Sequence, residues 1–224
     1  ESSDAAWMGE VYATPAVAAL RQRVTTDTLE RISYGQRAHW PVAVAATPRL
    51  ELSQLRITDR SLILVLDRTE KPGNLGACLR SASACGIDAV ILSQPVCELF
   101  NPNTIRASRG TVFTLPIAVA TASDSLSFCQ RSGLPVFAAR VDGSRELWDQ
   151  DFRSGAALVF GSEATGLGDE WAGEDVRSFK IPMHGAADSL NLSISAAVTL
   201  YEAFRQRTQA LSHSPDAKFD PHSG

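Results

Sequence analysis

A glycine-rich stretch, LVFGSEATGLGDEW at residues 158–171, sets a carboxylate inside a tight turn directly after an apolar run. Gly161 and Gly166 have the spacing of a phosphate-binding loop, but leucine and glycine follow where lysine and serine or threonine are required. Glu163 would moreover repel a phosphate held by backbone N–H groups. These glycines are better explained by close backbone approach to a ligand that lacks phosphate or carries positive charge.

The turn after an earlier apolar run excludes a second common kind of nucleotide site. Around Gly73 and Gly76 there is no G-x-G-x-x-G pattern, so a dinucleotide-dependent oxidoreductase lacks its phosphate fingerprint. S-adenosylmethionine has the properties that the glutamate-containing loop favours, because it joins adenosine to a cationic sulfonium and an amino acid end without any phosphate. It is one ligand of the kind that this loop could accept.

Cysteine and histidine spacing does not support a metal or redox site. The four cysteines form no C-x-x-C pair and no cluster with histidine. Cys78 and Cys85 stand seven residues apart, on one face of an expected helix, where a thiol most often behaves as a small buried hydrophobe. His184 lies near a polar loop, and a surface or hydrogen-bonded imidazole is the simpler interpretation. We therefore expect no metal.

Composition and charge describe an ordinary soluble chain with a local basic region. Hydrophobic residues make up 44% and charged residues 21% of the 224 residues, and the net charge is −4. Residues 60–110 nevertheless hold six basic and four acidic side chains, enough for a patch that contacts phosphates. No apolar stretch approaches the roughly 20 residues that span a bilayer, and no basic-then-apolar leader is present. We expect a cytoplasmic protein that does not enter membranes.

The elements that must position these loops predict an α/β fold. Short apolar runs rich in branched residues indicate strands buried on both faces. They lie at residues 62–67, 88–93, 111–119, 134–141, 156–161 and 179–183. The intervening helices are expected at residues 75–84, 101–110, 123–133 and 190–209. Strands that alternate with helices favour parallel pairing in one sheet.

Three segments of the chain are expected to differ in structure. Residues 1–57 predict a small α/β appendage with a helix at 14–24 and a strand at 42–46, which could be part of an RNA-binding domain. Residues 58–210 hold the alternating elements and form the main domain. Residues 211–224 are polar and interrupted by proline, so we expect a flexible tail there.

Three ordered segments resemble one family, the SpoU branch of the SPOUT superfamily of RNA ribose methyltransferases. They are NLGACLRSASACG at 74–86, LVFGSEATGL at 158–167 and IPMHGAADSLNLSISAAV at 181–198. The first matches an N-x-G-x-x-x-R pattern through Asn74, Gly76 and Arg80. The third matches through its I-P-M and S-L-N cores, although Asp188 stands where glutamate is common. The likeness spans residues 60–207, most of the expected main domain.

The resemblance implies a fold that no periodicity argument reveals. It implies a parallel-sheet SPOUT domain whose C-terminal part forms a deep trefoil knot, in a chain that forms homodimers; knots are otherwise almost absent from proteins. It also implies that S-adenosylmethionine lies in the knotted loops, against backbone groups at Gly161, Ile181 and Leu190. Met183 and Leu167 would line the same site. Core packing would equally explain the apolar members of this set.

The resemblance further implies methyl transfer to a ribose 2′-hydroxyl, with Arg80 beside the hydroxyl. A guanidinium keeps its proton in proteins, so we expect Arg80 to stabilise the forming alkoxide as a fixed charge rather than to act as a base. Asn74, Ser189 and Asn191 are expected to orient the same polar network. Glu163 is expected to fix the loops and the arginine by paired hydrogen bonds, or simply to close a turn.

RNA is the substrate that the resemblance implies. Arg106 and Arg109 are candidates for contacts to its phosphates, although ordinary surface positions would explain them equally well. The stretch KPGNLGACLR is more like the ribosomal RNA members than the transfer RNA members, which favours 23S-type ribosomal RNA. A transfer RNA 2′-O-ribose methyltransferase and a non-catalytic RNA-binding member are the alternatives. RAHWPVAVAATP, at 37–48, resembles only the closing part of the RNA-binding domain often attached to such enzymes.

Overall fold

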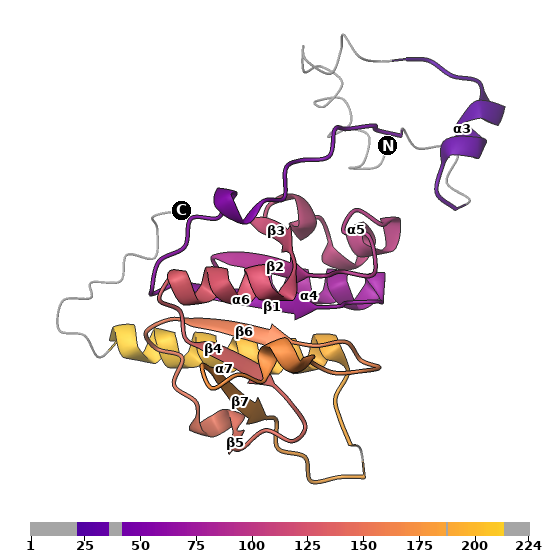
Figure 1. The fold of residues 1–224 in the computed structure, drawn as a ribbon. Helices are drawn as coiled ribbons and strands as arrows, with labels where there is room; N and C mark the ends of the chain where they lie inside the picture. Colours follow the sequence, from indigo (N-terminus) through magenta and orange to yellow (C-terminus); the bar gives the residue numbers. More distant parts are fainter. Residues whose placement is uncertain (1–21, 36–41, 187, 213–224) are drawn as a thin grey trace. The chain divides into compact units, whose positions relative to one another are not determined.

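The computed structural model (Figure 1) describes three stretches of the chain, residues 22–35, 42–186 and 188–212. The chain forms two compact units, residues 1–47 and residues 48–224. The helix expected at 14–24 lies mostly outside the described residues, and so does the tail expected at 211–224.

In the first unit, the described residues form one helix, α3 (Thr26–Ile32). The side chain of Thr25 caps it by accepting a hydrogen bond from the N–H of Thr28 at 3.2 Å. The strand expected at 42–46 is wrong, because these residues pair with no strand among the described residues, and Val44 is 97% exposed. An extended segment without ladder partners or a buried face has nothing to stabilise it as a strand.

The second unit is built on one sheet of seven strands in the order β3-β2-β1-β6-β4-β7-β5, and each neighbouring pair is parallel. The bounds are β1 (Leu62–Asp67), β2 (Ala89–Ser93), β3 (Ile117–Ala120), β4 (Val136–Ala139), β5 (Arg145–Glu146), β6 (Ala156–Phe160) and β7 (Val176–Lys180). In register, Leu64 of β1 lies between Val90 and Leu158. The expected α/β class with a parallel sheet is confirmed, whereas the knot stays a prediction.

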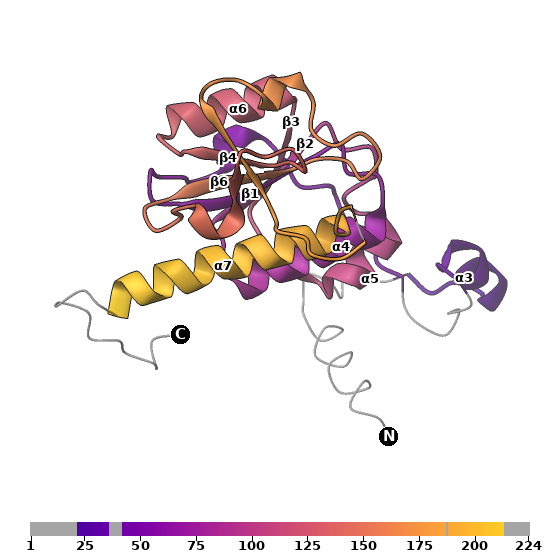
Figure 2. The same cartoon turned by 90° about the horizontal axis from the view of Figure 1, so that it is seen from below.

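Helices cover both faces of the sheet, as the two views in Figure 1 and Figure 2 show. One face carries α4 (Pro72–Ala84), α5 (Pro102–Ser108) and α7 (Leu192–Ser212), and the other carries α6 (Ala122–Arg131). None of the helices in the described part of the chain combines the length and apolar character needed to cross a membrane.

Successive residues of the central strands alternate between two cores. In β1, Leu62, Leu64 and Leu66 pack on the side of α4 and α7, whereas Ile63 and Val65 pack on the side of α6. Side chains of a strand point to opposite faces with a period of two. Because both faces are covered by helices, both sets must be apolar, which explains the continuous apolar runs.

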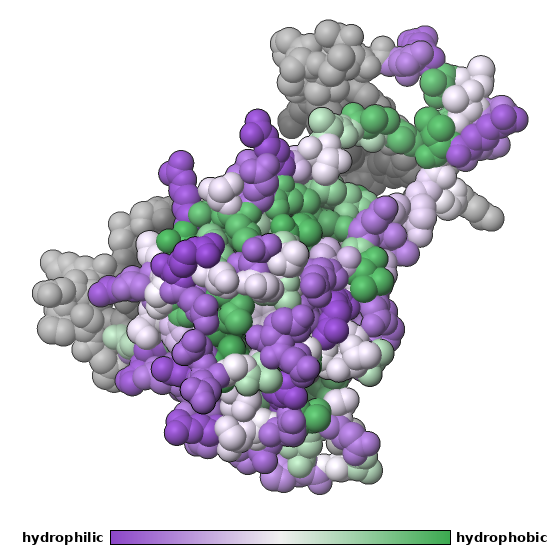
Figure 3. Space-filling view, viewed as in Figure 1, coloured by the Kyte–Doolittle hydropathy of each residue, from purple (hydrophilic) through white to green (hydrophobic). Residues whose placement is uncertain are grey.

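The segment before β1 packs onto the edge of the second unit. The carbonyl of Leu50 accepts a hydrogen bond from the N–H of Val119 in β3 at 2.8 Å. A 3₁₀ helix, η1 (Leu52–Gln54), follows, and Leu55 adds to the core on the α6 side. Covering an edge strand leaves fewer unpaired backbone groups. Apolar surface also gathers near this edge in Figure 3.

Two predicted strands are wrong over part of their length. Of residues 111–119, only the last three belong to β3, because Gly110, with φ of +92°, leads into a 3₁₀ turn, η2 (Thr111–Phe113). The strand expected at 179–183 begins earlier and ends at Lys180, two residues before Pro182, which has no N–H to donate to a ladder.

Gly76 sets how closely α4 packs against α5. A Cβ atom at this position would lie 2.6 Å from Ala107 Cβ and from Thr104 O, and 2.8 Å from Ser108 N. We expect Gly76→Ala to lower the free energy of unfolding by about 1–3 kcal/mol, as overpacking does. Gly73→Ala is the control, because nothing lies within 4 Å of its Cβ position. Urea denaturation measures both variants, and equal stabilities would contradict the packing argument.

Candidate active site

A cavity of about 910 Å³ opens at the carboxyl ends of β4, β6 and β7. The loops after these strands and the first turn of α7 line it. The lining includes all five residues expected to contact the cofactor: Gly161, Leu167, Ile181, Met183 and Leu190. Glu163, Ser189 and Asn191 line it as well. Ligands of open α/β sheets bind outside the carboxyl ends of the strands, so topology and motifs indicate the same place.

The glycine-rich loop after β6 folds back on itself. Gly166, with φ of +65°, donates its N–H to the carbonyl of Ser162 at 2.9 Å and closes the turn. A Cβ atom on Gly161 would lie 2.4 Å from the carbonyl carbon of Gly166. The sequence argument attributed this glycine to a ligand, but the backbone of the loop already requires it.

Two side chains tie this loop to the segment after β1. Ser162 Oγ donates to Glu70 Oε1 at 2.7 Å and accepts from two backbone N–H groups of its own loop. The Arg68 guanidinium donates to the carbonyl of Gly166 at 3.4 Å and to the buried carboxylate of Asp67 at 3.1 Å. Because β1 and β6 are neighbours in the sheet, their two loops form one connected wall.

Glu163 is the point at which the motifs meet. Its carboxylate accepts hydrogen bonds from Lys71 Nζ, Asn74 Nδ2 and Asn191 Nδ2, the last at 3.0 Å. Asn191 Nδ2 also lies 3.3 Å from Asn74 Oδ1. The hydrogen bond to Glu163 raises the pKa of Lys71, so the ammonium stays charged. We call these four side chains the Glu163 network.

Asn191 also begins α7. Its Oδ1 accepts hydrogen bonds from the N–H of Ser193 at 2.9 Å and from the Oγ of the same serine at 2.7 Å. Its carbonyl accepts from the N–H of Ser195 at 2.9 Å. This side-chain cap satisfies N–H groups that a helix start leaves free. Since the amide nitrogen of Asn191 binds Glu163, the helix start and the β6 loop are fixed to each other.

The expected pairing of Glu163 with Arg80 is wrong. Lys71, directly before α4, reaches the carboxylate instead. Arg80 follows Asn74 by six residues, about 9 Å along a helix axis at 1.5 Å per residue and on a different side of α4. Its side chain is exposed and forms no hydrogen bond or ion pair with the residues that the structure describes. Neither Arg80 nor Asn74 lines the cavity.

The remaining predicted site residues are exposed. Ser189 lies in the loop between β7 and α7, at the cavity, and its hydroxyl makes no hydrogen bond within the described part of the chain. Arg106 lies on α5 and Arg109 at its C-cap, and neither lines the cavity. The structure therefore brings the residues predicted to bind the cofactor together in one cavity, and the three arginines lie outside it.

Sequence reasoning missed two groups of residues. Glu70 and Lys71, after β1, hold the β6 loop. Arg140 and Asp142 in the loop after β4, and Glu146 in β5, line the cavity. Arg140 Nε donates to Asp142 Oδ1 at 3.0 Å, and this bond holds the pKa of Asp142 below its ordinary value. Their positions in the sequence could have predicted them, because polar residues directly after buried parallel strands meet at one edge of the sheet.

The cavity lining suits a cationic ligand that is partly apolar. Four carboxylates face it, from Asp142, Glu146, Glu163 and Asp188, and two basic side chains, from Arg140 and Lys180. This excess of negative charge favours positive groups such as a sulfonium and an ammonium. The apolar side chains of the lining supply surface for an adenosine, and the volume lies within the ~300–1,000 Å³ usual for small-molecule sites. The residues present therefore fit S-adenosylmethionine.

The cysteines are structural in this part of the molecule. Burial raises the pKa of the Cys78 and Cys129 thiols to about 12, so both stay protonated and unreactive. Among the residues that the structure describes, no group of three or more histidine, cysteine, aspartate or glutamate side chains could hold a metal ion.

This architecture is that of the SPOUT methyltransferase class. Within that class, the chain belongs to the SpoU rRNA Methylase family, whose model matches residues 61–201 and so includes the whole Glu163 network.

Three known proteins illustrate the similarity. The chain is 38% identical over 194 residues to the 23S rRNA (guanosine-2′-O-)-methyltransferase RlmB of Xylella fastidiosa, covering 84% of this chain and 78% of that protein. The AdoMet-bound SpoU methyltransferase AviRb of Streptomyces viridochromogenes matches with a TM-score of 0.77 at 26% identity, covering 88% of this chain and 78% of that one. The AdoMet-bound rRNA methyltransferase of Sinorhizobium meliloti matches with a TM-score of 0.67 at 34% identity. That match covers 70% of this chain and 61% of the other, so this chain spans about three fifths of that protein.

Proposed function

We propose that this chain is an S-adenosylmethionine-dependent RNA 2′-O-ribose methyltransferase that acts on 23S-type ribosomal RNA in the cytoplasm. One observation carries the proposal: the residues that the resemblance assigns to the cofactor line a single cavity, and Glu163 joins that cavity to the motif that holds Arg80. Membership of the SpoU family and the names of the relatives from Xylella and Streptomyces support it.

The reaction divides between the cofactor and the residues of the chain. When bound, S-adenosylmethionine supplies a methyl group on a cationic sulfur. The carboxylates of the lining offset its charge, and the Glu163 network holds the start of α4, the β6 loop and the start of α7 in one geometry. Arg80 is free to place positive charge beside the 2′-oxygen and so to stabilise alkoxide character as the proton leaves to water or to a phosphate oxygen.

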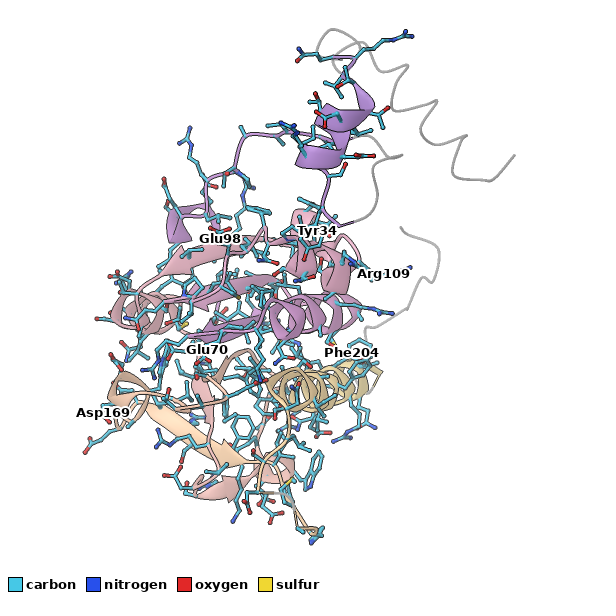
Figure 4. All side chains as sticks on the ribbon, turned by 90° about the vertical axis from the view of Figure 1, so that its right-hand side faces the viewer. Tyr34, Glu70, Glu98, Arg109, Asp169 and Phe204 are labelled. Atoms are coloured by element: carbon cyan, nitrogen blue, oxygen red, sulfur yellow. The ribbon has the colours of Figure 1, made fainter. Side chains whose placement is uncertain are left out.

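The proposed enzyme acts as a homodimer through α7. Ile194, Tyr201 and Phe204 lie on one face of this helix at spacings of seven and three residues and are 50%, 53% and 44% exposed. Phe204 is labelled in Figure 4. A stripe of large apolar side chains on a helix whose other face is buried is typical of an interface. We expect Tyr201→Asp to shift the mass measured by light scattering toward the monomer, whereas Trp148→Asp, at an exposed aromatic residue outside α7, leaves it unchanged.

Gly161 is expected to be essential for cofactor binding. Gly161→Ala pushes a Cβ atom into the backbone of Gly166 and Leu167, at 2.4 Å and 2.6 Å, so the loop that lines the cavity must move. We expect the dissociation constant of S-adenosylmethionine, measured by calorimetry, to rise at least about tenfold, or 1.4 kcal/mol. Gly173→Ala is the control, because nothing lies within 4 Å of its Cβ position. An unchanged affinity in Gly161→Ala would contradict the placement of the cofactor.

The function is tested by methyl transfer. The purified protein is incubated with labelled S-adenosylmethionine and unmodified ribosomal or transfer RNA, and the digested nucleosides are identified by mass spectrometry. Label on a 2′-O-methyl nucleoside of 23S-type RNA supports the proposal. Label only on transfer RNA indicates the alternative substrate, and cofactor binding without transfer to any RNA indicates a non-catalytic RNA-binding protein.

A further inference from the structure

The segment formed by α5 and η2, residues 100–113, is a compact lobe whose two ends meet. Phe100 precedes α5 and Phe113 ends η2, and their rings stack with centroids 6.0 Å apart and planes 13° apart. Within the lobe, Thr111 Oγ1 donates to the carbonyl of Ser108 at 2.8 Å, and the N–H of Phe113 donates to the carbonyl of Gly110 at 3.0 Å. These bonds hold Phe113 in place on a rigid turn.

Phe113 presents an aromatic ring that the described residues leave largely uncovered. It is 65% exposed, whereas Phe100 is partly buried and packs against the main core. Keeping a large aromatic ring in contact with water is unfavourable. A partner that covers the ring therefore stabilises it. Apolar surface gathers near β3 in Figure 3, and Phe113 lies four residues before that strand.

Two basic side chains lie on the same lobe as this ring. Arg106 and Arg109 are exposed, and neither guanidinium has a hydrogen bond or ion pair with a described residue. Arg109 adopts φ of +56°, a left-handed conformation that is uncommon for arginine, and projects outward from the end of α5 (Figure 4). This conformation ends the helix as an αL C-cap. One exposed acidic residue, Glu98, also lies near the lobe, two residues before Phe100 in the sequence.

We propose that the lobe binds single-stranded RNA, with an unpaired base stacked on the open face of Phe113 and with Arg106 and Arg109 on the flanking phosphates. Exposed aromatic rings beside basic side chains are the usual platform for unpaired bases, which every sequence can supply because each base has a flat face. The inference rests on the proposed function, since it takes RNA as the substrate. It adds that the RNA is recognised in an unpaired segment outside the reacting nucleotide.

Binding measurements on the full chain test the lobe. A short fluorescein-labelled RNA of mixed sequence is titrated as a single strand and as a duplex with its complement, with fluorescence anisotropy as the readout. We expect Phe113→Ala to weaken single-strand binding about tenfold, as loss of base stacking does, and to leave duplex binding unchanged. Phe113→Tyr keeps a stacking ring and should bind as the wild type does. Trp148→Ala, at another exposed aromatic residue, is the matched control.

The arginines give a second readout that does not depend on Phe113. Each phosphate contact to a single strand adds about 0.7 to the slope of log affinity against log salt. We expect Arg106→Ala and Arg109→Ala each to lower the slope by about that amount, whereas Arg131→Ala on α6 leaves it unchanged. If the salt dependence of RNA affinity is unchanged in both variants, the proposed phosphate contacts are refuted.

Two other results would overturn the stacking site. If Phe113→Ala binds single-stranded RNA as tightly as the wild type, the ring does not stack on a base, and a protein partner becomes the occupant. If Phe113→Ala loses equal affinity for the single strand and the duplex, the ring does not recognise an unpaired base. Methyl transfer by the wild type, measured in parallel, separates this inference from the proposed function. If the wild type methylates RNA and Phe113→Ala binds single-stranded RNA normally, only the proposed RNA site on the lobe is refuted. If binding depends on Phe113 but the wild type transfers no methyl group, only the proposed enzymatic function is refuted.

Discussion

Arg80→Ala is expected to lower kcat for RNA methylation by about 10²–10³-fold, the usual cost of losing one group that stabilises a developing oxyanion. Arg80 is exposed, unpaired among the described residues and outside the cavity, so its charge is available to substrate rather than engaged in the fold. For the same reason the affinity for S-adenosylmethionine should not change. Single-turnover methylation and calorimetry measure the two quantities on the same preparation.

Arg131→Ala is the matched control for Arg80→Ala, because it removes an exposed arginine from α6 on the opposite face of the sheet. Arg80→Lys keeps the charge without the planar fork and should fall between the two. The pH–rate profile should contain no ionisation that is lost only in the Arg80 variants, since a guanidinium does not act as a base. Full activity in Arg80→Ala, or an equal loss of cofactor affinity, would refute the assignment.

The position of Arg80 outside the cavity also gives a test of the proposed homodimer. If a second copy supplies the arginine, then Arg80→Ala and Gly161→Ala, each impaired alone, should recover part of the activity when mixed, because one site in the mixed dimer has both functional parts. No recovery, with mixed dimers demonstrated by differently tagged chains, would mean that each copy completes its own site.

Glu163→Ala is expected to lower kcat/KM by about 10²-fold, the effect of a misplaced reacting geometry. The substitution removes the acceptor shared by Lys71, Asn74 and Asn191, so α4, the β6 loop and the start of α7 lose their common link. The pKa of Lys71, which the carboxylate raises, should fall back toward its ordinary value. Steady-state kinetics and NMR titration of the lysine measure these effects.

Glu174→Ala, at an exposed carboxylate with no hydrogen bond or ion pair to a described residue, is the control for Glu163→Ala. The double variant Glu163→Ala with Asn191→Ala should lose less than the product of the single losses, because residues of one network act together. Strictly multiplicative losses would show that the two side chains act independently and that the network is not a unit.

Local patterns were sufficient for much of the fold and for the residues that line the cavity. The continuous apolar runs at 62–67 and 156–161 predicted strands buried on both faces because helices must cover a parallel sheet on both sides. The order of three motifs, through family resemblance, predicted that Gly161, Ile181 and Leu190 share a site, and all three line the cavity. The same local reasoning placed a strand at 42–46, where no partner strand exists among the described residues.

The sequence by itself therefore determined the α/β class, the strands and helices with apolar periodicity, and the family whose motifs mark the site. Only the tertiary structure decided which polar groups meet. Glu163 bonds to Lys71, 92 residues earlier, rather than to Arg80, and Phe100 stacks on Phe113 across a helix. Burial periodicity is a local property of neighbouring residues, whereas these contacts depend on strand order and on helix rise, which bring distant loops to one edge of the sheet.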